Sequence, residues 1–369
     1  MPEIGLRGVT KRFEETTAID DVSMTVRDRE YLCVVGPTGS GKSTLLRLIA
    51  GLVRADRGSI LIDGHVVNDV PPERRNAALM PQNYALFPHM TAWQNVSYGP
   101  ASRGLDPEFI ETRTRRLFRV VKLQNWAKAY PDQLSGGMQQ RVALIRCLAG
   151  GAKILLLDEP LGALDARLRL DLRRRLKGFA RRFKLTVVHV THDQAEAISL
   201  GDRVLLLRRG RVEQEGTPRR LYFNPRSIFA ASFIGERVLL EGVTRETHEG
   251  LARIEVSGIG SVLAVAKGLA RGDLAVLSVR RESLRFAGPS DRDMNRMKGV
   301  VRDIRPLGAY FRYSIELPRG NLVHAHVPSS VALESSVSQG SEVELCFSPR
   351  ETLAYGYPMR GLALEVEAL

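Results

Sequence analysis

The sequence of 369 residues has little cysteine and no long apolar segment. Its three cysteines, Cys33, Cys147 and Cys346, form no CxxC pair, which argues against a disulfide framework or a zinc site and favours a reducing compartment. No segment approaches the roughly 18 consecutive apolar residues that a membrane-spanning helix needs. The first residues, MPEIGLRGVTKRF, lack the apolar centre of a secretory signal. We therefore expect a cytosolic protein.

Basic residues exceed acidic ones, and the net charge is +13. A nucleic acid or an anionic membrane surface could be the partner of such a chain. The excess is spread over many segments, and the densest run, 167–184, carries Leu168, Leu172 and Leu176 at helical spacing. That spacing predicts an amphipathic helix with a solvated basic face. The charge is compatible with a position near a membrane without indicating one.

The first 235 or so residues alternate short apolar strands with longer helical patterns, which predicts a parallel sheet covered by helices. We expect strands at Tyr31–Val35, Lys153–Leu157, Thr186–Val190 and Val204–Leu207. We expect helices at Ser43–Ile49, Glu108–Leu123 and Met138–Ala149. A hairpin is expected over Ser59–Val67, because the pair Asp63–Gly64 favours a type I′ turn.

The pattern changes after Gly235 to short alternating strands separated by glycine, proline and serine. The expected strands are Leu251–Val256, Leu274–Val279, Phe311–Ile315, Leu322–Val327 and Val343–Phe347. Many short strands of this kind predict a small barrel or sandwich. We expect a linker over residues 224–236. The predicted domains are therefore residues 1–236 and 237–369.

The sharpest motif is GPTGSGKST, which satisfies G-x-x-x-x-G-K-[ST] between a predicted strand and a predicted helix. Glycines let the backbone approach a phosphate closely, and the free N–H groups at the helix start form an anion cradle. The lysine would neutralise the β- and γ-phosphates, and the serine after it would bind Mg²⁺. The predicted ATP-binding residues are Gly36, Pro37, Thr38, Gly39, Ser40, Gly41, Lys42, Ser43 and Thr44.

A second motif, KILLLDEP, places Asp158 and Glu159 at the end of a predicted central strand. Ligands bind at such carboxyl ends in open α/β sheets. Asp158 suits a direct or second-sphere Mg²⁺ role, and Glu159 suits a general base that polarises the attacking water. The alternative, a solvated turn, is disfavoured by the phosphate-binding loop elsewhere in the chain.

The third motif, LSGGMQQR at residues 134–141, opens a predicted helix. Ser135, Gly136 and Gly137 stand at its N-terminus and make a second anion-binding cap. This octet resembles the signature motif of the ATP-binding cassette (ABC) family. With Gln139 these residues become predicted nucleotide contacts.

The resemblance covers Ile4 to about Glu236 and implies an α/β P-loop NTPase (RecA-like) core with a helical signature subdomain at about residues 83–150. It also implies further site residues. Phe13 would stack on adenine, Gln82 would reach Mg²⁺ and the attacking water, Asp165 would lie at a dimer interface, and His192 would contact the γ-phosphate.

The resemblance thus implies catalytic roles for Glu159, His192 and Gln82, and metal-binding roles for Ser43, Gln82 and Asp158. Family members bind head to tail as dimers around two ATP molecules, so the signature of one copy completes the site of the other. Every motif residue that the chemistry needs is present, so the sequence predicts an active ATPase.

The second domain resembles the OB-type regulatory domain of importer ATPases, with Lys298–Leu317 matching a recurring strand pair. The implied protein is a peripheral subunit at the cytoplasmic face of a membrane. It would act with separate permease chains and, indirectly, an extracytoplasmic binding protein. The aromatic segment Asn83–Tyr98 is either the groove that receives the permease or ordinary packing of the helical subdomain.

Two other functions are suggested by parts of the sequence. A soluble ABC ATPase acting on nucleic acid would suit the basic charge, but such proteins resemble paired cassettes or cassettes split by coiled coils, so we expect no nucleic-acid partner. The second domain could also act as a ligand sensor. Its pair His324 and His326 could bind a metal, although a half-exposed structural strand is favoured. His189 is expected in the core or at an interface.

Overall fold

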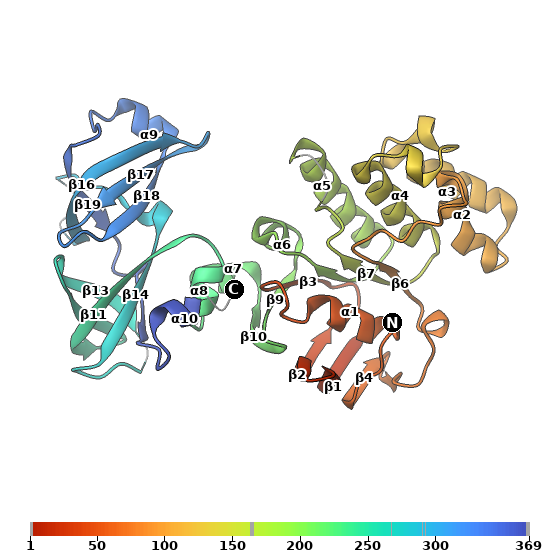
Figure 1. The fold of residues 1–369 in the computed structure, drawn as a ribbon, viewed down its shortest axis with the longest axis horizontal. Coiled ribbons are helices and arrows are strands. Elements are labelled where there is room, and N and C mark those ends of the chain that lie inside the picture. The colour runs from red at the N-terminus through yellow and green to blue at the C-terminus, as the bar shows by residue number, and fades with distance from the viewer. Residues whose placement is uncertain (1–2, 163–165, 267, 290, 292, 367–369) are drawn as a thin grey trace. The chain divides into compact units, whose positions relative to one another are not determined.

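The computed structural model describes residues 3–162, 166–266, 268–289, 291 and 293–366. The chain divides into two compact units, residues 1–221 and 222–369 (Figure 1). The helix α8 (Ile228–Phe233) occupies the expected linker, buries Ile228, Phe229 and Phe233, and contacts α10 (Leu362–Val366) of the second unit. The domain boundary at residue 236 stays a prediction.

The centre of the first unit is a six-stranded sheet with the order β10-β9-β3-β8-β7-β6. Its strands are β3 (Tyr31–Val35), β6 (Ala77–Met80), β7 (Ile154–Asp158), β8 (Thr186–Val190), β9 (Arg203–Arg208) and β10 (Arg211–Gly216). All neighbours pair in parallel except β10 with β9. Every residue of β3, β7 and β8 is buried, as expected for a parallel sheet covered on both faces. The predicted parallel sheet is confirmed.

A second, antiparallel sheet has the order β2-β1-β4-β5 and was not predicted as such. Its strands are β1 (Ile4–Phe13), β2 (Thr16–Val26), β4 (Arg57–Ile62) and β5 (His65–Val66). The hairpin between β4 and β5 is confirmed, because Asp63 and Gly64 both have positive φ, at 54° and 77°. One core joins this sheet to α1 (Lys42–Ala50) and to β3, β8 and β9.

The remaining helices of the first unit are α2 (Ala92–Ser102), α3 (Pro107–Val120), α4 (Gly136–Ala149), α5 (Ala166–Arg182), α6 (Gln194–Leu200) and α7 (Pro218–Phe223), the last crossing the unit boundary. Figure 1 shows α2, α3 and α4 grouped away from the antiparallel sheet. The helix α3 ends three residues before the predicted Leu123, because Lys122 takes a left-handed φ of 55°. The predicted amphipathic helix is α5, with Leu172 and Leu176 buried.

The second unit contains a closed barrel of β11 (Arg237–His248), β12 (Leu251–Val256), β13 (Gly260–Ala266), β14 (Leu274–Arg280) and β20 (Leu353–Gly356). The predicted small barrel is confirmed. A further five-stranded sheet comprises β15 (Arg285–Phe286), β16 (Asn295–Pro306), β17 (Tyr310–Glu316), β18 (Leu322–Pro328) and β19 (Glu342–Phe347). The short helix α9 (Ser329–Glu334) follows β18. Barrel and sheet share one hydrophobic core.

Two other expectations concern single residues and membrane spans. The three cysteines are buried, and so is His189, which is fully inaccessible. A membrane-spanning helix is not found in the part of the chain that the structure describes. The described residues also contain no group of three or more His, Cys, Asp or Glu side chains that could hold a metal ion. His324 instead contacts the Ser314 hydroxyl at 3.1 Å.

Candidate nucleotide site

The loop between β3 and α1 has a backbone that only glycine permits at two points. A Cβ atom on Gly36 would lie 2.1 Å from the carbonyl oxygen of Leu207. A Cβ atom on Gly41, where φ is +100°, would lie 2.2 Å from the carbonyl oxygen of Ala18. Real Cβ atoms do not approach backbone that closely, so these glycines let the loop pack against β2 and β9. The loop therefore keeps a fixed shape ahead of the helix N-terminus.

Lys42 folds back over this loop. Its Nζ donates hydrogen bonds to the carbonyl oxygens of Gly36 at 2.8 Å and Pro37 at 2.7 Å. Burial lowers the pKa of the ammonium, while the nearby Glu159 and Asp158 carboxylates raise it. The buried Ser40 hydroxyl has no hydrogen-bond partner among the described residues. A held cation and an unpartnered buried hydroxyl in one glycine loop fit a phosphate group.

Two of the three residues predicted to bind a metal, Ser43 and Asp158, lie together. Asp158, the last residue of β7, is buried, and burial raises the pKa of its carboxyl group. A hydrogen bond from the Ser43 side chain acts in the opposite direction. Ser43 stands in the first turn of α1, so β7 and α1 bring one carboxylate and one hydroxyl to the same point. Oxygen ligands of this kind suit Mg²⁺.

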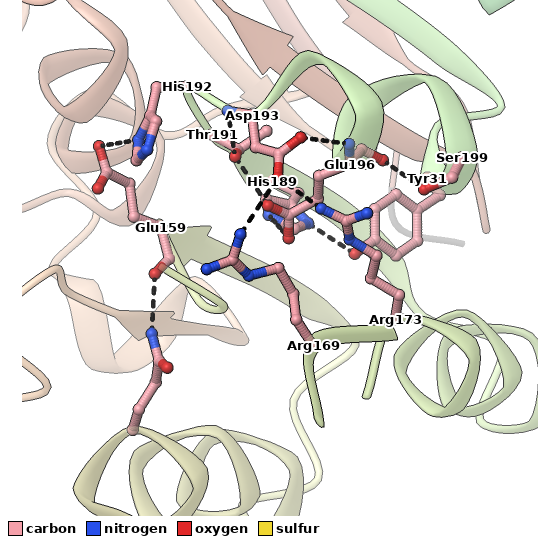
Figure 2. Close-up of polar contacts among 11 residues, drawn as sticks. Tyr31, Glu159, Arg169, Arg173, His189, Thr191, His192, Asp193, Glu196 and Ser199 are labelled. Atoms are coloured by element: carbon pink, nitrogen blue, oxygen red, sulfur yellow. Dashed lines mark hydrogen bonds and ion pairs between the residues drawn. The ribbon is translucent and has the colours of Figure 1, made fainter. Parts of the chain in front are cut away.

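Glu159 lies between two other predicted catalytic residues. Its carboxylate oxygens lie 3.3 Å from Gln82 Nε2 and 3.3 Å from His192 Nδ1, the latter contact visible in Figure 2. The strands that precede Gln82, Glu159 and His192 are β6, β7 and β8, which are neighbours in the parallel sheet. Their carboxyl ends meet at one edge, so the three side chains converge.

The backbone of Glu159 is also held in place. Its φ is +49°, a left-handed conformation that costs energy for a residue other than glycine. Its N–H donates to the carbonyl oxygen of Val190 at 2.9 Å, and its carbonyl oxygen accepts from Gln140 Nε2 at 3.2 Å. Strain that is retained by surrounding hydrogen bonds is characteristic of functional positions.

Comparisons with known proteins identify the family of the chain. A family model described as "ABC transporter" matches residues 19–162, and a "TOBE domain" model matches residues 277–354. The spermidine/putrescine import ATP-binding protein PotA of Nitrosospira multiformis is 39% identical over 89% of this chain and 92% of that protein. PotA of Acidothermus cellulolyticus is 41% identical over 85% of this chain and 84% of that protein. This chain belongs to the ABC transporter family. Within the family it is an ATP-binding subunit and an ATPase, as the sequence predicted.

Solved ABC cassettes have the same fold as the first unit. A dimer of the ATP-binding cassette MJ0796 bound to ADP and Pi matches with a TM-score of 0.54 and 33% identity, over 58% of this chain and 99% of that one. A second dimeric structure of that cassette matches with a TM-score of 0.55. The predicted α/β P-loop cassette is confirmed, and the TOBE match agrees with the β-rich second unit.

The ABC signature opens α4, whereas the phosphate-binding loop leads into α1. Ser135 caps α4, its hydroxyl accepting from the N–H of Met138, while Gln139 Nε2 donates to the carbonyl oxygens of Pro131 and Leu134. None of the contacts described for this chain joins residues 135–139 to residues 36–44. Ser135 and Gly136 are exposed, and so remain accessible to a second molecule.

Two further predicted contacts stand outside this cluster. Phe13 is the last residue of β1, with 43% of its surface exposed, and Lys11 Nζ lies 5.2 Å from its ring centre. An exposed ring at a strand end can stack on a base without rearrangement. Asp165 lies outside the described residues, so its predicted place at a dimer interface has no structural description.

Gln140 is a site residue that the sequence analysis missed. It is buried on α4 and donates to the backbone of Glu159. The sequence contained an indication of its burial, because Ala143 and Leu144, three and four residues later, lie on the buried face of the same helix. A polar residue at such spacing on a buried face requires a partner.

The predicted docking segment Asn83–Tyr98 is partly packed and partly exposed. Trp93 stacks on Phe118 inside the helical subdomain, with ring centres 5.8 Å apart. Phe87 packs against Tyr98 at 4.9 Å, and Tyr98 remains 47% exposed. Packing therefore explains the tryptophan, while an aromatic surface is left near Tyr98.

Proposed function

We propose that this ABC ATPase energises solute import through separate membrane permease subunits, as a dimer at the cytoplasmic face of the membrane. The observation that carries the chemical part is the convergence of Gln82, Glu159 and His192 at the strand ends beside the phosphate-binding loop. The names of the relatives support the import function.

In the proposed reaction, the loop 36–44 cradles the phosphates of ATP through its backbone N–H groups. Lys42 exchanges its two loop carbonyl contacts for phosphate oxygens, which is favourable because they carry full charge. Mg²⁺, held by Ser43 and Asp158 with Gln82, would neutralise phosphate charge. The Phe13 ring would stack on the adenine.

Glu159 is the proposed general base. Its carboxylate orients a water molecule for attack on the γ-phosphate, with Gln82 fixing one oxygen of the carboxylate by a hydrogen bond. His192 contacts the other oxygen and would move to the γ-phosphate when ATP is present. Positioning and charge stabilisation then supply most of the rate, as in other phosphoryl transfers.

The site is proposed to be completed by a second copy of the chain. The signature residues Ser135, Gly136, Gly137 and Gln139 would contact the nucleotide held by the partner, and Asp165 would lie at the interface. Two features support this arrangement: the exposure of Ser135 and Gly136, and the dimeric state of the related cassette bound to ADP and Pi. The exposed aromatic surface near Tyr98 is the proposed contact with the permease.

The relatives are named as spermidine/putrescine importers, which supports an organic polycation as the cargo. Uptake of labelled spermidine and putrescine by cells that express the chain with its permease tests this, with Lys42→Ala as the inactive control. If neither polyamine accumulates while the isolated chain hydrolyses ATP, the cargo is wrong and the ATPase proposal stands.

The central experiment measures ATP hydrolysis and oligomeric state for the wild type and Glu159→Gln. Loss of a positioned base should lower kcat by about 10²- to 10⁴-fold. The variant should form an ATP-stabilised dimer that does not turn over. The exposed Glu108→Gln on α3 is the matched control and should keep wild-type activity. Equal hydrolysis by Glu159→Gln and wild type would show that the base is assigned to the wrong residue.

A further inference from the structure

The exposed His192 is flanked by residues that are fixed in the protein. Its own side chain is 66% exposed and contacts only Glu159 among the interactions described for it. Thr191, before it, is 1% exposed. Asp193, after it, caps the N-terminus of α6 by accepting from the N–H of Glu196 at 2.9 Å. The position of the imidazole is therefore set through the backbone of its two neighbours.

Thr191 is anchored in two directions. Its N–H continues the parallel sheet by donating to the carbonyl oxygen of Val34 at 3.1 Å. Its hydroxyl donates to Glu196 Oε2 at 2.9 Å and accepts from the N–H of Asp193 at 3.0 Å. One hydroxyl thus ties the turn that carries His192 to the buried carboxylate of Glu196, as Figure 2 shows.

Glu196 is only 3% exposed, and a buried carboxylate requires partners. Burial alone raises its pKa, but contacts with His189 and Thr191 outweigh that effect and lower it. His189 Nε2 lies 3.3 Å from Glu196 Oε1, and His189 Nδ1 lies 2.8 Å from the Tyr31 hydroxyl. The contact between His189 and Glu196, at 3.3 Å, is an electrostatic contact and not a well-aligned hydrogen bond.

The ring of His189 lies between two buried groups, with Nδ1 facing the Tyr31 hydroxyl and Nε2 facing the Glu196 carboxylate. Burial raises the pKa of Tyr31 well above its usual value, so that hydroxyl keeps its proton. The chain of contacts runs from Tyr31 on β3, the strand that leads into the phosphate-binding loop, to the His192 turn. The contacts with His189 and Thr191 favour the ionised form of Glu196.

Asp193 makes a second set of contacts that fix the turn carrying His192. Its Oδ2 accepts from Arg173 at 2.6 Å and lies 3.7 Å from Arg169 on the same helix, α5. Arg169 also donates to the carbonyl oxygen of Gly162 at 3.3 Å, in the segment that follows Glu159. Figure 2 shows both arginines beside Asp193. The turn that carries His192 and the segment after Glu159 are therefore joined through Arg169.

We propose that Thr191, Glu196 and Asp193 are positioning residues, which hold the imidazole of His192 in the position and orientation that hydrolysis requires. This proposal rests on the proposed role of His192 in the reaction. Small displacements of a reacting group are costly, and a misplacement of about 1 Å can lower a rate about a hundredfold. The carboxylate of Glu196 is joined to the turn that carries His192 by the hydrogen bond that it accepts from the Thr191 hydroxyl.

The first test compares Thr191→Val, which removes the hydroxyl at nearly constant shape, with Thr191→Ser, which keeps it. We expect Thr191→Val to lower kcat by about tenfold while KM for ATP stays within about twofold, because the hydroxyl acts on positioning and not on ATP binding. Thr191→Ser should recover most of the rate. Ser199→Ala is the matched control, since its hydroxyl lies on α6 and, among the described contacts, donates to the backbone carbonyl of Glu196 and to no side chain. Equal kcat values for Thr191→Val and wild type would overturn the proposal.

The second test separates positioning from general damage to the fold. If Thr191 acts through His192, Thr191→Val should have no further effect on the residual single-turnover rate of His192→Ala. A further tenfold loss in the double variant would mean that Thr191 acts on stability elsewhere, and would overturn the proposal. Full activity of His192→Ala would instead refute the role of His192 given under the proposed function, so the two failures are distinguishable.

Discussion

Arg75 is a buried side chain that closes the end of the helix following the phosphate-binding loop. It is 4% exposed, and its guanidinium donates to the carbonyl oxygens of Leu48 at 2.9 Å and Ile49 at 3.1 Å, in the last turn of α1. It also donates to the carbonyl oxygens of Val70 at 2.8 Å and Asn68 at 3.3 Å. One cation thus satisfies four carbonyl groups, two of them at a helix C-terminus.

Replacing Arg75 by methionine keeps the aliphatic stem and removes all five donors. A hydrogen bond to a charged group contributes about 1.5–3 kcal/mol, and a cation at a partly buried helix C-terminus up to about 2 kcal/mol. These contributions overlap, because the same contacts supply both. Arg75→Met also leaves buried carbonyl groups without a partner, so we expect the free energy of unfolding of the first unit to fall by about 3 kcal/mol.

Urea unfolding followed by tryptophan fluorescence measures this change. Both tryptophans, Trp93 and Trp126, lie in the first unit, so the signal reports that unit alone. The neighbouring Arg74 is exposed, and Arg74→Met is the matched control, with an expected change within about 0.5 kcal/mol. If the two variants unfold at the same urea concentration, the buried hydrogen bonds of Arg75 do not carry the stability assigned to them.

Three further predictions concern backbone, pH and thiol chemistry. Gly41→Ala should destabilise the first unit at least about 2 kcal/mol more than Gly39→Ala in urea unfolding, because both have positive φ but only Gly41 faces backbone within 3 Å. Burial lowers the pKa of His324 and His326, so the unfolded chain takes up protons first as pH falls below about 6.5. The second unit should then lose stability with falling pH, measured by hydrogen exchange at β18, and a His324→Gln, His326→Gln variant should show a flatter profile. Burial raises the pKa of Cys147 to about 11, so iodoacetamide should modify it only after unfolding; rapid labelling of the native protein would contradict this.

Much of the fold could be predicted because its signals are local. Strand and helix alternation predicted the parallel sheet, and the pair Asp63–Gly64 predicted the hairpin. The sheet of β1 and β2 was missed, since long strands with mixed burial lack a clear period. In the C-terminal unit the strand pair expected within Lys298–Leu317 is present as β16 and β17, but the division of the strands into a barrel and a second sheet was missed for another reason. The sequence of a short alternating strand does not indicate which other strand it pairs with, because pairing depends on contacts between residues that are far apart in the sequence.

The sequence by itself was sufficient to predict nucleotide binding and ATP hydrolysis, because each nucleotide motif is contiguous and carries its residue types at fixed spacing. Only the tertiary structure decided which residues meet. Gln82, Glu159 and His192 are far apart along the chain, and they converge because β6, β7 and β8 are neighbours that end at one edge. The burial of Glu196 beside Thr191 could not be predicted from the sequence either. A glutamate on a short helix is expected to be exposed to solvent, and only the tertiary packing buries it.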